Sequence, residues 1–388
     1  MKKSLFTALI FLALLMQGFS QQNYLDTIMS GGFMRTFRVY IPAIYNAQTP
    51  RPLLFQFHGY GMNAEFFEGS GFKQVADTAN FILITPNGTI DPVYPQFGQG
   101  WNTYTCCFPV DDVLFVSDLI DTLRQQYNID TTRVFGAGFS NGGMMAYELG
   151  CRLSNRIAAA ASVAGTMINS RLESCNPPRA VPVLEIHGTN DSALPWDGLI
   201  TGIDTFMGID IVMQHWVDLN ECPLFPTITD LPNTDTTDGS TVTRYVWANC
   251  NDNSSVELFK VIGGGHAWPG HPYPNINQDI IAEQEIWRFF LKYKLTETTH
   301  TTDKPDFEQL SVYPNPASGY LTFENRSTAD GCLTLVQTDG RIVAKLRLQG
   351  YGQQQVSVAD VPQGLLLWKW VPGCEGAMQT GRVMVVRK

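Results

Sequence analysis

Short, continuously apolar segments alternate with amphipathic segments between residues 33 and 293. A continuous apolar run of about five residues is typical of a strand that is buried on both faces of a sheet. Runs of this kind, or close to it, predict eight strands: Phe37–Ile41, Leu53–Phe57, Phe81–Thr85, Arg133–Ala137, Ala158–Val163, Val181–Ile186, Thr243–Trp247 and Leu258–Ile262.

The segments between these runs predict helices, because their apolar residues recur every three or four positions. One helix is expected to follow Asp111 and Asp112, which are both placed to cap it, and to bury Val113, Val116, Ile120, Leu123 and Tyr127. Further helices are predicted over Asn141–Leu153, Ile209–Leu219 and Asp279–Tyr293. This alternation indicates an α/β fold, with a doubly wound, mainly parallel sheet covered on both faces.

The pattern changes after Tyr293. Residues 296–309 are mostly polar, rich in Thr and without apolar periodicity, which is typical of a linker. Residues 310–388 contain short apolar runs and turn signals, among them Asp339-Gly340, a hairpin signal. We therefore expect one α/β domain over residues 21–295, a linker over 296–309 and a small all-β sandwich over 310–388.

The first twenty residues predict a secretory signal peptide. Lys2 and Lys3 precede an apolar run from Leu5 to Met16, and Gly18-Phe19-Ser20 offers a cleavage site before Gln21. The alternative is a membrane anchor, but a bilayer-spanning helix needs about 20 apolar residues. The protein is expected to be exported through the periplasm to the cell surface or beyond, without a stable membrane span.

Composition narrows the classes of function. Hydrophobic residues make up 44% of the chain and charged residues 16%, so a packed core is expected. The formal net charge is −10, and no segment concentrates Lys and Arg. Because binding of a phosphate backbone needs clustered positive charge, we expect no nucleic-acid partner.

The eight cysteines indicate disulfides, since the chain is expected in an oxidising compartment. Their positions favour local bridges, and Cys106 and Cys107 either bond to each other or find other partners. No second Cys pair or nearby His completes a zinc site around these two residues. The predicted bridges are Cys151 with Cys175, Cys222 with Cys250, and Cys332 with Cys374.

Gly138-Phe139-Ser140-Asn141-Gly142 fits the pattern G-x-S-x-G. The pattern is common by chance, and an ordinary Gly-rich turn is the alternative. Here a predicted strand leads in and a predicted helix leads out, as the nucleophile elbow of an α/β hydrolase requires. Ser140 is therefore the expected nucleophile.

A serine nucleophile needs a base and an acid that orients it, and in this fold they follow in the order Ser, Asp or Glu, His. Asp191 lies just beyond the strand Val181–Ile186, whereas its competitor Asp197 is further from the strand end. His266 follows the strand Leu258–Ile262 and a run of three glycines, and His271 is the rival base. We expect Asp191 as the acid and His266 as the base.

Two backbone N–H groups are expected to form an oxyanion hole. One belongs to Asn141, the residue after the nucleophile, and the other to the loop His58-Gly59-Tyr60-Gly61 after the strand Leu53–Phe57. Tyr60 is the preferred donor in that loop and Gly59 the alternative. His58 is expected to hold the loop through a hydrogen bond.

The motifs together resemble the secreted esterase family of polyhydroxybutyrate depolymerases, feruloyl esterases and some acetylxylan esterases. The resemblance implies a Ser140–Asp191–His266 triad, an acyl-enzyme on Ser140, and neither a metal nor an organic cofactor. The matching segments are HGYG at 58–61, GWN at 100–102, VDDVLFVSDLID at 110–121, GFSNGGMMAYELGC at 138–151, PVLEIHGTND at 182–191 and GGGHAWPG at 263–270.

Aromatic residues in the loops beside the predicted site suggest an aromatic-lined cleft for a polymeric ester. Trp101 and Trp268 are the preferred substrate contacts, and Tyr104 and Trp196 lie in similar positions. Feruloyl or acetyl esters of plant cell-wall polysaccharide are the expected substrates, and polyhydroxybutyrate is the alternative. A peptidase and a non-catalytic polymer-binding protein are the alternatives from other classes.

Tyr313-Pro314-Asn315-Pro316 and the β-rich run to the C-terminus resemble the sorting domain of the type IX secretion system of Bacteroidetes. The resemblance implies the type IX secretion machinery as a partner. The alternative is a carbohydrate- or polymer-binding sandwich, in which Trp368 and Trp370 would supply exposed aromatic rings.

Overall fold

The computed structural model describes residues 21–90, 95–103, 110–201, 205–295, 310–314, 317–325, 327, 329–337, 340–374 and 379–386. The predicted signal peptide (residues 1–20), the predicted linker (296–309), Tyr104, Cys106 and Cys107 lie outside these residues. The chain divides into two compact units, of which the smaller holds the C-terminal strands.

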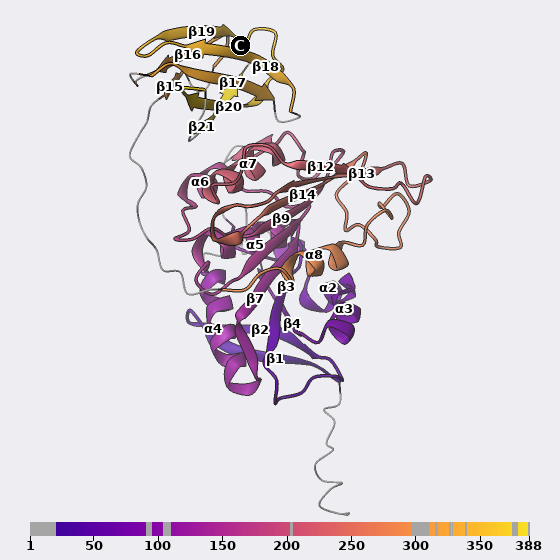
Figure 1. The fold of residues 1–388 in the computed structure, drawn as a ribbon. Helices are drawn as coiled ribbons and strands as arrows, with labels where there is room; N and C mark the ends of the chain where they lie inside the picture. Colours follow the sequence, from indigo (N-terminus) through magenta and orange to yellow (C-terminus); the bar gives the residue numbers. More distant parts are fainter. Residues whose placement is uncertain are drawn as a thin grey trace, which may run out of the picture. The chain divides into compact units, whose positions relative to one another are not determined.

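The larger unit is built on one ten-stranded sheet (Figure 1). Its central strands, from β4 to β14, run parallel, while β1, β2, β13 and β12 join antiparallel at the two edges. In spatial order the strands are β1 (Gln22–Ser30), β2 (Phe33–Ile41), β4 (Ile82–Pro86), β3 (Arg51–Phe57), β7 (Ile129–Phe139), β8 (Ala159–Val163), β9 (Val183–Gly188), β14 (Val256–Ile262), β13 (Thr241–Trp247) and β12 (Thr227–Asp230).

All eight predicted strands are present in this sheet, so the α/β prediction is confirmed. The two strands that the apolar runs did not predict, β1 and β12, lie at its edges. In β1, more and less exposed residues alternate, and every residue of β12 is exposed. Neither edge strand is buried on both faces, so neither carries a continuous apolar run.

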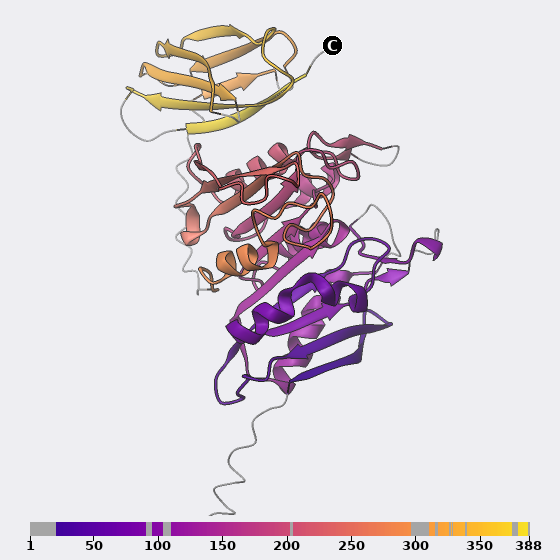
Figure 2. The ribbon, with the colours of Figure 1, turned by 90° about the vertical axis from the view of Figure 1, so that its right-hand side faces the viewer.

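Helices cover both faces of the sheet (Figures 1 and 2). On one face α3 (Phe72–Ala79) and α8 (Ala282–Phe290) pack on a core with Leu54 and Phe135. On the other face lie α4 (Asp112–Gln126), α5 (Asn141–Arg152) and α7 (Ile209–Leu219). Shorter elements are α2 (Ala64–Phe67), α6 (Asn169–Ser174), β5 (Thr89–Ile90), β6 (Gln99–Gly100), β10 (Leu199–Ile200), β11 (Thr205–Phe206) and the 3-10 turns η1 (Glu68–Ser70), η2 (Pro95–Phe97) and η3 (Asn251–Asn253).

Two details of the predicted helices are wrong. Asp111 alone caps α4, its carboxylate accepting from the backbone N–H groups of Val113 and Leu114, whereas Asp112 is buried and paired with Arg35. The last helix begins at Ala282 instead of Asp279, because the backbone of Ile281 is extended, and the Asp279 carboxylate accepts from the Thr234 N–H instead of capping the helix.

The three predicted disulfides are present: Cys151–Cys175, Cys222–Cys250 and Cys332–Cys374. The first two lie in the larger unit. Cys151 is on α5 and Cys175 follows α6, so this bridge joins the two helices.

The smaller unit is an all-β sandwich, as predicted. One sheet contains β15 (Leu310–Tyr313), β16 (Tyr320–Asn325) and β19 (Gln353–Ser357), and the other contains β18 (Ile342–Leu348), β17 (Gly331–Gln337), β20 (Gly364–Pro372) and β21 (Gln379–Val385). β17 and β18 pair antiparallel, as the predicted hairpin requires, and Gly340 between them has φ +85°, while Asp339 lies outside the described residues. Trp368 and Trp370 are buried in the core of this unit, which removes the exposed rings that a polymer-binding surface would need.

Candidate active site

Ser140 lies in a tight turn between β7 and α5. Its backbone has φ +54° and ψ −120°, a conformation that side-chain-bearing residues adopt only when the surroundings hold it. A Cβ on Gly138 would lie 2.1 Å from the Gly142 carbonyl oxygen, and one on Gly142 would lie 2.1 Å from that of Phe57. Only glycine fits at either position, and the turn leaves Ser140 half-buried at the start of the helix.

Asn141 begins α5, so its backbone N–H lies at the N-terminal end of the helix, where N–H groups lack an intrahelical acceptor. The Asn141 side chain is used differently. Its Oδ1 accepts from the Trp101 backbone N–H at 2.7 Å, and its Nδ2 donates to Thr103 Oγ1 at 2.9 Å. The side chain thus holds the 101–103 loop against the helix start, while the helix end favours negative charge near Ser140.

His266 and Asp191 are in direct contact. Nδ1 of His266 lies 2.7 Å from Oδ2 of Asp191, and the other carboxylate oxygen accepts from the backbone N–H groups of Ala193 and Leu194, both at 2.8 Å. The Asp191 side chain is fully buried, whereas the His266 ring keeps 22% of its surface exposed. The competitor Asp197 is exposed.

Burial by itself raises the pKa of Asp191. The hydrogen bond and charge of His266, the Leu194 N–H and the charge of His187 outweigh it, so the pKa lies below its ordinary value. Asp191 is therefore an ionised acceptor that fixes the hydrogen on Nδ1 of His266. The other ring nitrogen, Nε2, is left as the one that can take a proton.

The loops carrying Asp191 and His266 are joined through their backbones. They leave the ends of the parallel neighbours β9 and β14, and the Asn190 N–H donates to the Gly264 carbonyl at 2.9 Å. A Cβ on Gly188 would lie 2.2 Å from that same oxygen, so the close approach requires glycine. The Gly263 N–H donates to Thr189 Oγ1 at 2.9 Å.

The same arrangement places His266 beside the elbow. Phe139, directly before Ser140, has its ring centroid 4.9 Å from that of His266. From the opposite side, a Cβ on Gly59 would lie 3.4 Å from the Ser140 Cβ. The end of β7, the His266 loop and the 58–61 loop therefore meet around Ser140.

His58 holds the 58–61 loop, as expected. Its ring is buried, Nδ1 lies 2.8 Å from the Gly59 carbonyl, and Nε2 accepts from the Gly88 N–H at 3.0 Å. Burial lowers the pKa of His58 to about 4, so the ring is neutral near pH 7. In the same loop, the N–H groups of Gly61 and Met62 donate to the carbonyls of Gln99 and Gly59. Tyr60, the preferred oxyanion donor, is half-buried beside the Phe97 ring.

Trp101 is fully buried, so its ring does not line a cleft as expected. Its indole N–H donates to the His58 carbonyl at 2.8 Å, and the ring packs against Phe57 and His58. Through these contacts Trp101 holds the start of the 58–61 loop in place.

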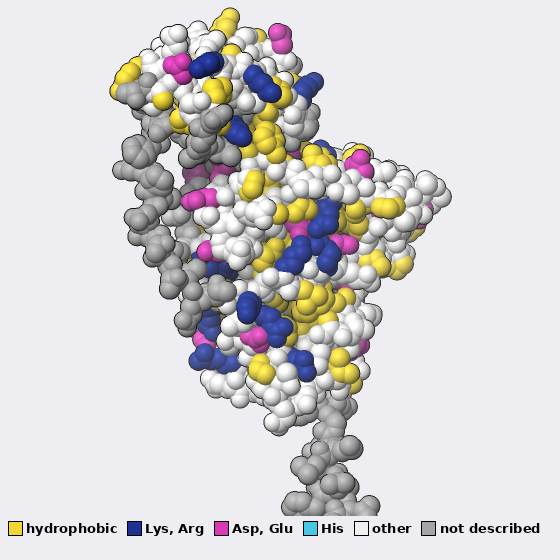
Figure 3. Space-filling view, in the orientation of Figure 1, with side chains coloured by type: hydrophobic (Ala, Val, Ile, Leu, Met, Phe, Trp, Pro, Cys, Tyr) yellow, Lys and Arg dark blue, Asp and Glu magenta, His cyan; other side chains and the backbone are white. Residues whose placement is uncertain are grey.

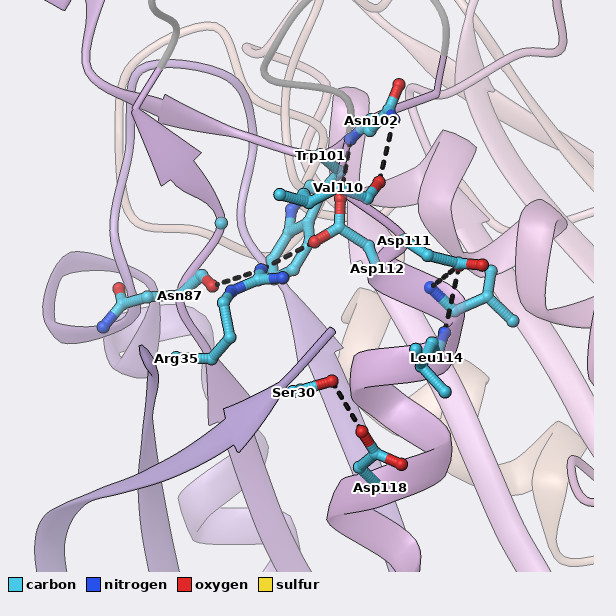
Figure 4. A network of polar contacts seen from close by, with 12 residues as sticks. Ser30, Arg35, Asn87, Trp101, Asn102, Val110, Asp111, Asp112, Leu114 and Asp118 are labelled. Atoms are coloured by element: carbon cyan, nitrogen blue, oxygen red, sulfur yellow. Dashed lines mark hydrogen bonds and ion pairs between the residues drawn. The ribbon is translucent and has the colours of Figure 1, made fainter. Parts of the chain in front are cut away.

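A buried ion pair underlies the Trp101 loop (Figure 4). Arg35 Nη2 lies 2.6 Å from Asp112 Oδ1, and Asp112 Oδ2 accepts from the Asn102 N–H at 2.8 Å. The Asn102 side chain donates to the Val110 carbonyl. The segments GWN at 100–102 and VDD at 110–112 are therefore structural supports of the site, and Arg35 was not singled out from the sequence.

Trp268 is also largely buried, with 7% of its surface exposed. It packs against Phe67 and Phe72, and its indole N–H donates to Glu283 Oε2 at 2.9 Å. Trp268 borders an open groove of about 800 Å³ between α3 and α8, whose polar side chains include Gln74 and Glu283.

The base loop continues into α8, which is anchored by charge. Glu257 on β14 is fully buried and paired with Arg244, Arg288 and Lys292, and basic side chains gather over β14 and α8 in Figure 3. The described residues contain neither a candidate metal site nor a membrane-spanning helix. Among them, no group of three His, Cys, Asp or Glu side chains is placed to hold a metal ion. None of the helices in the described part of the chain is long and apolar enough to cross a membrane.

Residues 41–198, which include Ser140 and Asp191, match the phospholipase/carboxylesterase family. The larger unit therefore has the α/β-hydrolase fold, which its sheet topology also shows. Residues 311–372, within the smaller unit, match the secretion system C-terminal sorting domain, and this match supports secretion of the protein.

Individual relatives of the α/β-hydrolase unit carry esterase names. Feruloyl esterase B of Piromyces equi is 30% identical over 237 residues, covering 59% of this chain and 42% of its own. A bifunctional acetylxylan esterase/xylanase of Neocallimastix patriciarum is 29% identical, covering 66% and 33%. The chain thus spans less than half the length of either relative. The solved acetyl xylan esterase of Aspergillus awamori is 13% identical at a TM-score of 0.49, covering 69% of this chain and 98% of its own.

Proposed function

We propose that the protein is a secreted serine esterase that hydrolyses carboxylic esters through an acyl-enzyme on Ser140. The observation that carries this proposal is the 2.7 Å contact between His266 Nδ1 and Asp191 Oδ2, located beside the Ser140 elbow. An oriented base next to a strained serine at a helix N-terminus is the arrangement that activates a weak hydroxyl nucleophile.

In the proposed first step, Nε2 of His266 takes the proton of Ser140 Oγ as Oγ attacks the ester carbonyl carbon. The backbone N–H groups of Asn141 and Tyr60 stabilise the oxyanion, and His266 returns the proton to the departing alkoxide. In the second step, water loses a proton to the same nitrogen and attacks the acyl-enzyme, which releases the acid and restores Ser140. Asp191 stays ionised and steadies the imidazolium in both steps.

Plant cell-wall polysaccharide carrying feruloyl or acetyl groups is the proposed substrate class. The names of the relatives support it, namely feruloyl esterase and acetylxylan esterase. The sorting domain supports an extracellular substrate and the type IX machinery as export partner. Trp101 has no exposed surface for a substrate, so Trp268 at the edge of the α3–α8 groove is the better of the two predicted contacts.

A p-nitrophenyl acetate assay tests the reaction class. We expect turnover by the wild type, a loss of at least about 10³-fold in Ser140→Ala, and no change in Ser174→Ala, which alters an exposed serine on α6. Equal rates in the wild type and Ser140→Ala would overturn the proposal.

A substrate panel tests the substrate class. It compares methyl ferulate, acetylated xylan, hydroxybutyrate oligomers and a peptide anilide at equal enzyme concentration. The proposal expects the highest kcat/KM on one of the first two. Preference for the oligomers would assign a polyester depolymerase, and turnover of the anilide alone would assign a peptidase.

A further inference from the structure

Asp191 has a second histidine neighbour, which the proposed mechanism does not use. His187 is buried at the end of β9, and its Nε2 lies 3.4 Å from Asp191 Oδ2 and 2.9 Å from the Leu194 carbonyl oxygen. Its Nδ1 lies 3.0 Å from Glu185 Oε1. The Leu194 carbonyl oxygen only accepts, so Nε2 donates, and Nδ1 donates as well when Glu185 is ionised. A ring that donates from both nitrogens is an imidazolium.

Glu185 is the counter-charge of this imidazolium. It is completely buried on β9, and its second oxygen, Oε2, accepts from the Tyr147 hydroxyl at 2.6 Å. Burial raises the pKa of the Glu185 carboxyl, while the hydrogen bond and charge of His187 and the hydrogen bond from Tyr147 oppose that rise. Tyr147 belongs to α5, the helix that begins directly after Ser140.

His58 shows the contrasting state within the same molecule. Its Nε2 accepts from a backbone N–H, so only Nδ1 carries a hydrogen and the ring is neutral. Burial alone would lower the pKa of His187 in the same way. The hydrogen bond and charge of Glu185, the Leu194 carbonyl and the charge of Asp191 outweigh it and raise that pKa.

The surroundings of His187 favour a positive charge. Glu185 and Asp191 provide two carboxylates, and Trp196 presents its ring with centroids 6.1 Å apart. The register partner of His187 on β14 is Lys260, whose ammonium lies over the Trp196 ring. The positive charge of Lys260 is outweighed by the carboxylates of Glu185 and Asp191, which both contact the His187 ring.

We propose that His187 is a positioning residue for the proposed triad: a buried imidazolium, held by Glu185, that keeps the Asp191 carboxylate ionised and turned toward His266. This inference rests on the proposed roles of Ser140, Asp191 and His266. The contacts then run in series from Tyr147 on α5 through Glu185, His187 and Asp191 to His266 beside the elbow.

The charge on His187 has a kinetic consequence. It offsets part of the negative charge that Asp191 presents to the catalytic base. Without it, the full negative charge of Asp191 faces that base and favours the protonated, inactive form of the free enzyme. The acid limb of kcat/KM, which reports the free-enzyme base, should move to higher pH.

Two variants remove the charge in different ways. Glu185→Gln keeps the shape of the side chain and leaves His187 neutral, while His187→Gln removes the ring. In both we expect the acid limb to rise by about one pH unit and kcat/KM on that limb to fall about ten-fold, with little change in KM. Tyr45→Phe is the matched control, because it removes the hydrogen bond of a buried tyrosine hydroxyl with the Asn128 N–H and leaves the charge pair untouched, so its acid limb should stay in place.

A merely structural role would lower the melting temperature or the amount of active enzyme without moving the acid limb. An unmoved limb in folded Glu185→Gln would therefore overturn the proposal. If His187→Gln does not fold, Glu185→Gln alone decides this point.

The charge state can also be measured without turnover, by ¹⁵N NMR of the histidine rings in the full chain. His187 should show both nitrogens protonated at pH 7, His58 one, and His187 in Glu185→Gln one. A neutral His187 in the wild type would overturn the inference. An enzyme without ester turnover but with a doubly protonated His187 would instead overturn the proposed function, and with it the role in positioning a catalytic base.

Discussion

Arg35 and Asp112, which lie 77 residues apart in the chain, form a buried ion pair 2.6 Å long beneath the loop that carries Trp101. Burial raises the pKa of Asp112 against the opposing charge of Arg35, which shows that the carboxylate is costly to keep ionised there. Such a pair contributes to the stability of the fold only while both partners are present, because either partner alone is an uncompensated buried charge.

Removal of Arg35 alone should therefore be more harmful than removal of both partners. We expect Arg35→Met to lose about 3 kcal/mol in the free energy of unfolding, and Arg35→Met/Asp112→Leu to recover part of that loss. Urea unfolding of the two variants and the wild type measures both. Additive losses in the double variant would contradict the interpretation.

The glycines around the site differ sharply in the space that surrounds them. Gly188→Ala places a methyl group 2.2 Å from a backbone oxygen, so we expect a loss of about 1–3 kcal/mol in stability and lower activity, as the loops of Asp191 and His266 separate. Gly69→Ala has no atom within 4 Å of the new Cβ and serves as the control. Thermal melts and p-nitrophenyl acetate rates distinguish them, and an undisturbed Gly188→Ala would show that the loops are not held together at this point.

Asp191 should make the stability of the fold depend on pH. Its pKa is lowered in the folded state, so its contribution is complete above the ordinary value of an aspartate, about 3.9, and is lost as the pH falls through the lowered value. The melting temperature of Asp191→Asn should therefore lie below that of the wild type at pH 7, and the gap should narrow below about pH 4. Ser140→Ala should show no such narrowing.

The two compact units predict separable functions. Deletion of residues 310–388 should leave the kcat/KM of the purified enzyme on p-nitrophenyl acetate unchanged and prevent its export, which cell fractionation would reveal. Trp370→Ala in the full chain should destabilise the small unit by about 3–5 kcal/mol, because the ring is completely buried. Loss of binding to polymer with normal export in the deletion variant would favour a binding domain.

Local pattern was sufficient to predict the eight strands and to choose the contacting pair Asp191 and His266. Both residues come shortly after a predicted strand end, and parallel neighbouring strands end at the same edge of the sheet. The G-x-S-x-G turn is equally local, since its glycines are required by contacts within the turn and with the adjacent strand.

Features that depend on distant partners could not be predicted in this way. From the sequence, Asp112 is predicted to cap a helix, because its partner Arg35 is distant in the chain and meets it only in the folded sheet. Trp101 is predicted to be exposed, because the sequence does not show that the 58–61 loop packs over it. The protonation of His187 depends on Glu185, Leu194 and Asp191 together. The spacing of apolar residues along the sequence does not show which hydrogen-bond acceptors surround a side chain in the fold.

The junction of the Asp191 and His266 loops is made largely by main-chain atoms, with Asn190 N–H on the Gly264 carbonyl and no room for a Cβ at Gly188. Hydrogen bonds between main-chain atoms persist when a side chain elsewhere in the loop is exchanged for one that fits the same backbone conformation. The exposed residues 272–275, further along the segment that follows His266, can therefore be redesigned for a different acyl or alcohol group without altering the spacing of acid and base. For enzyme engineering, this loop is the natural site for a library, and Gly188 and Gly264 are the residues to leave untouched.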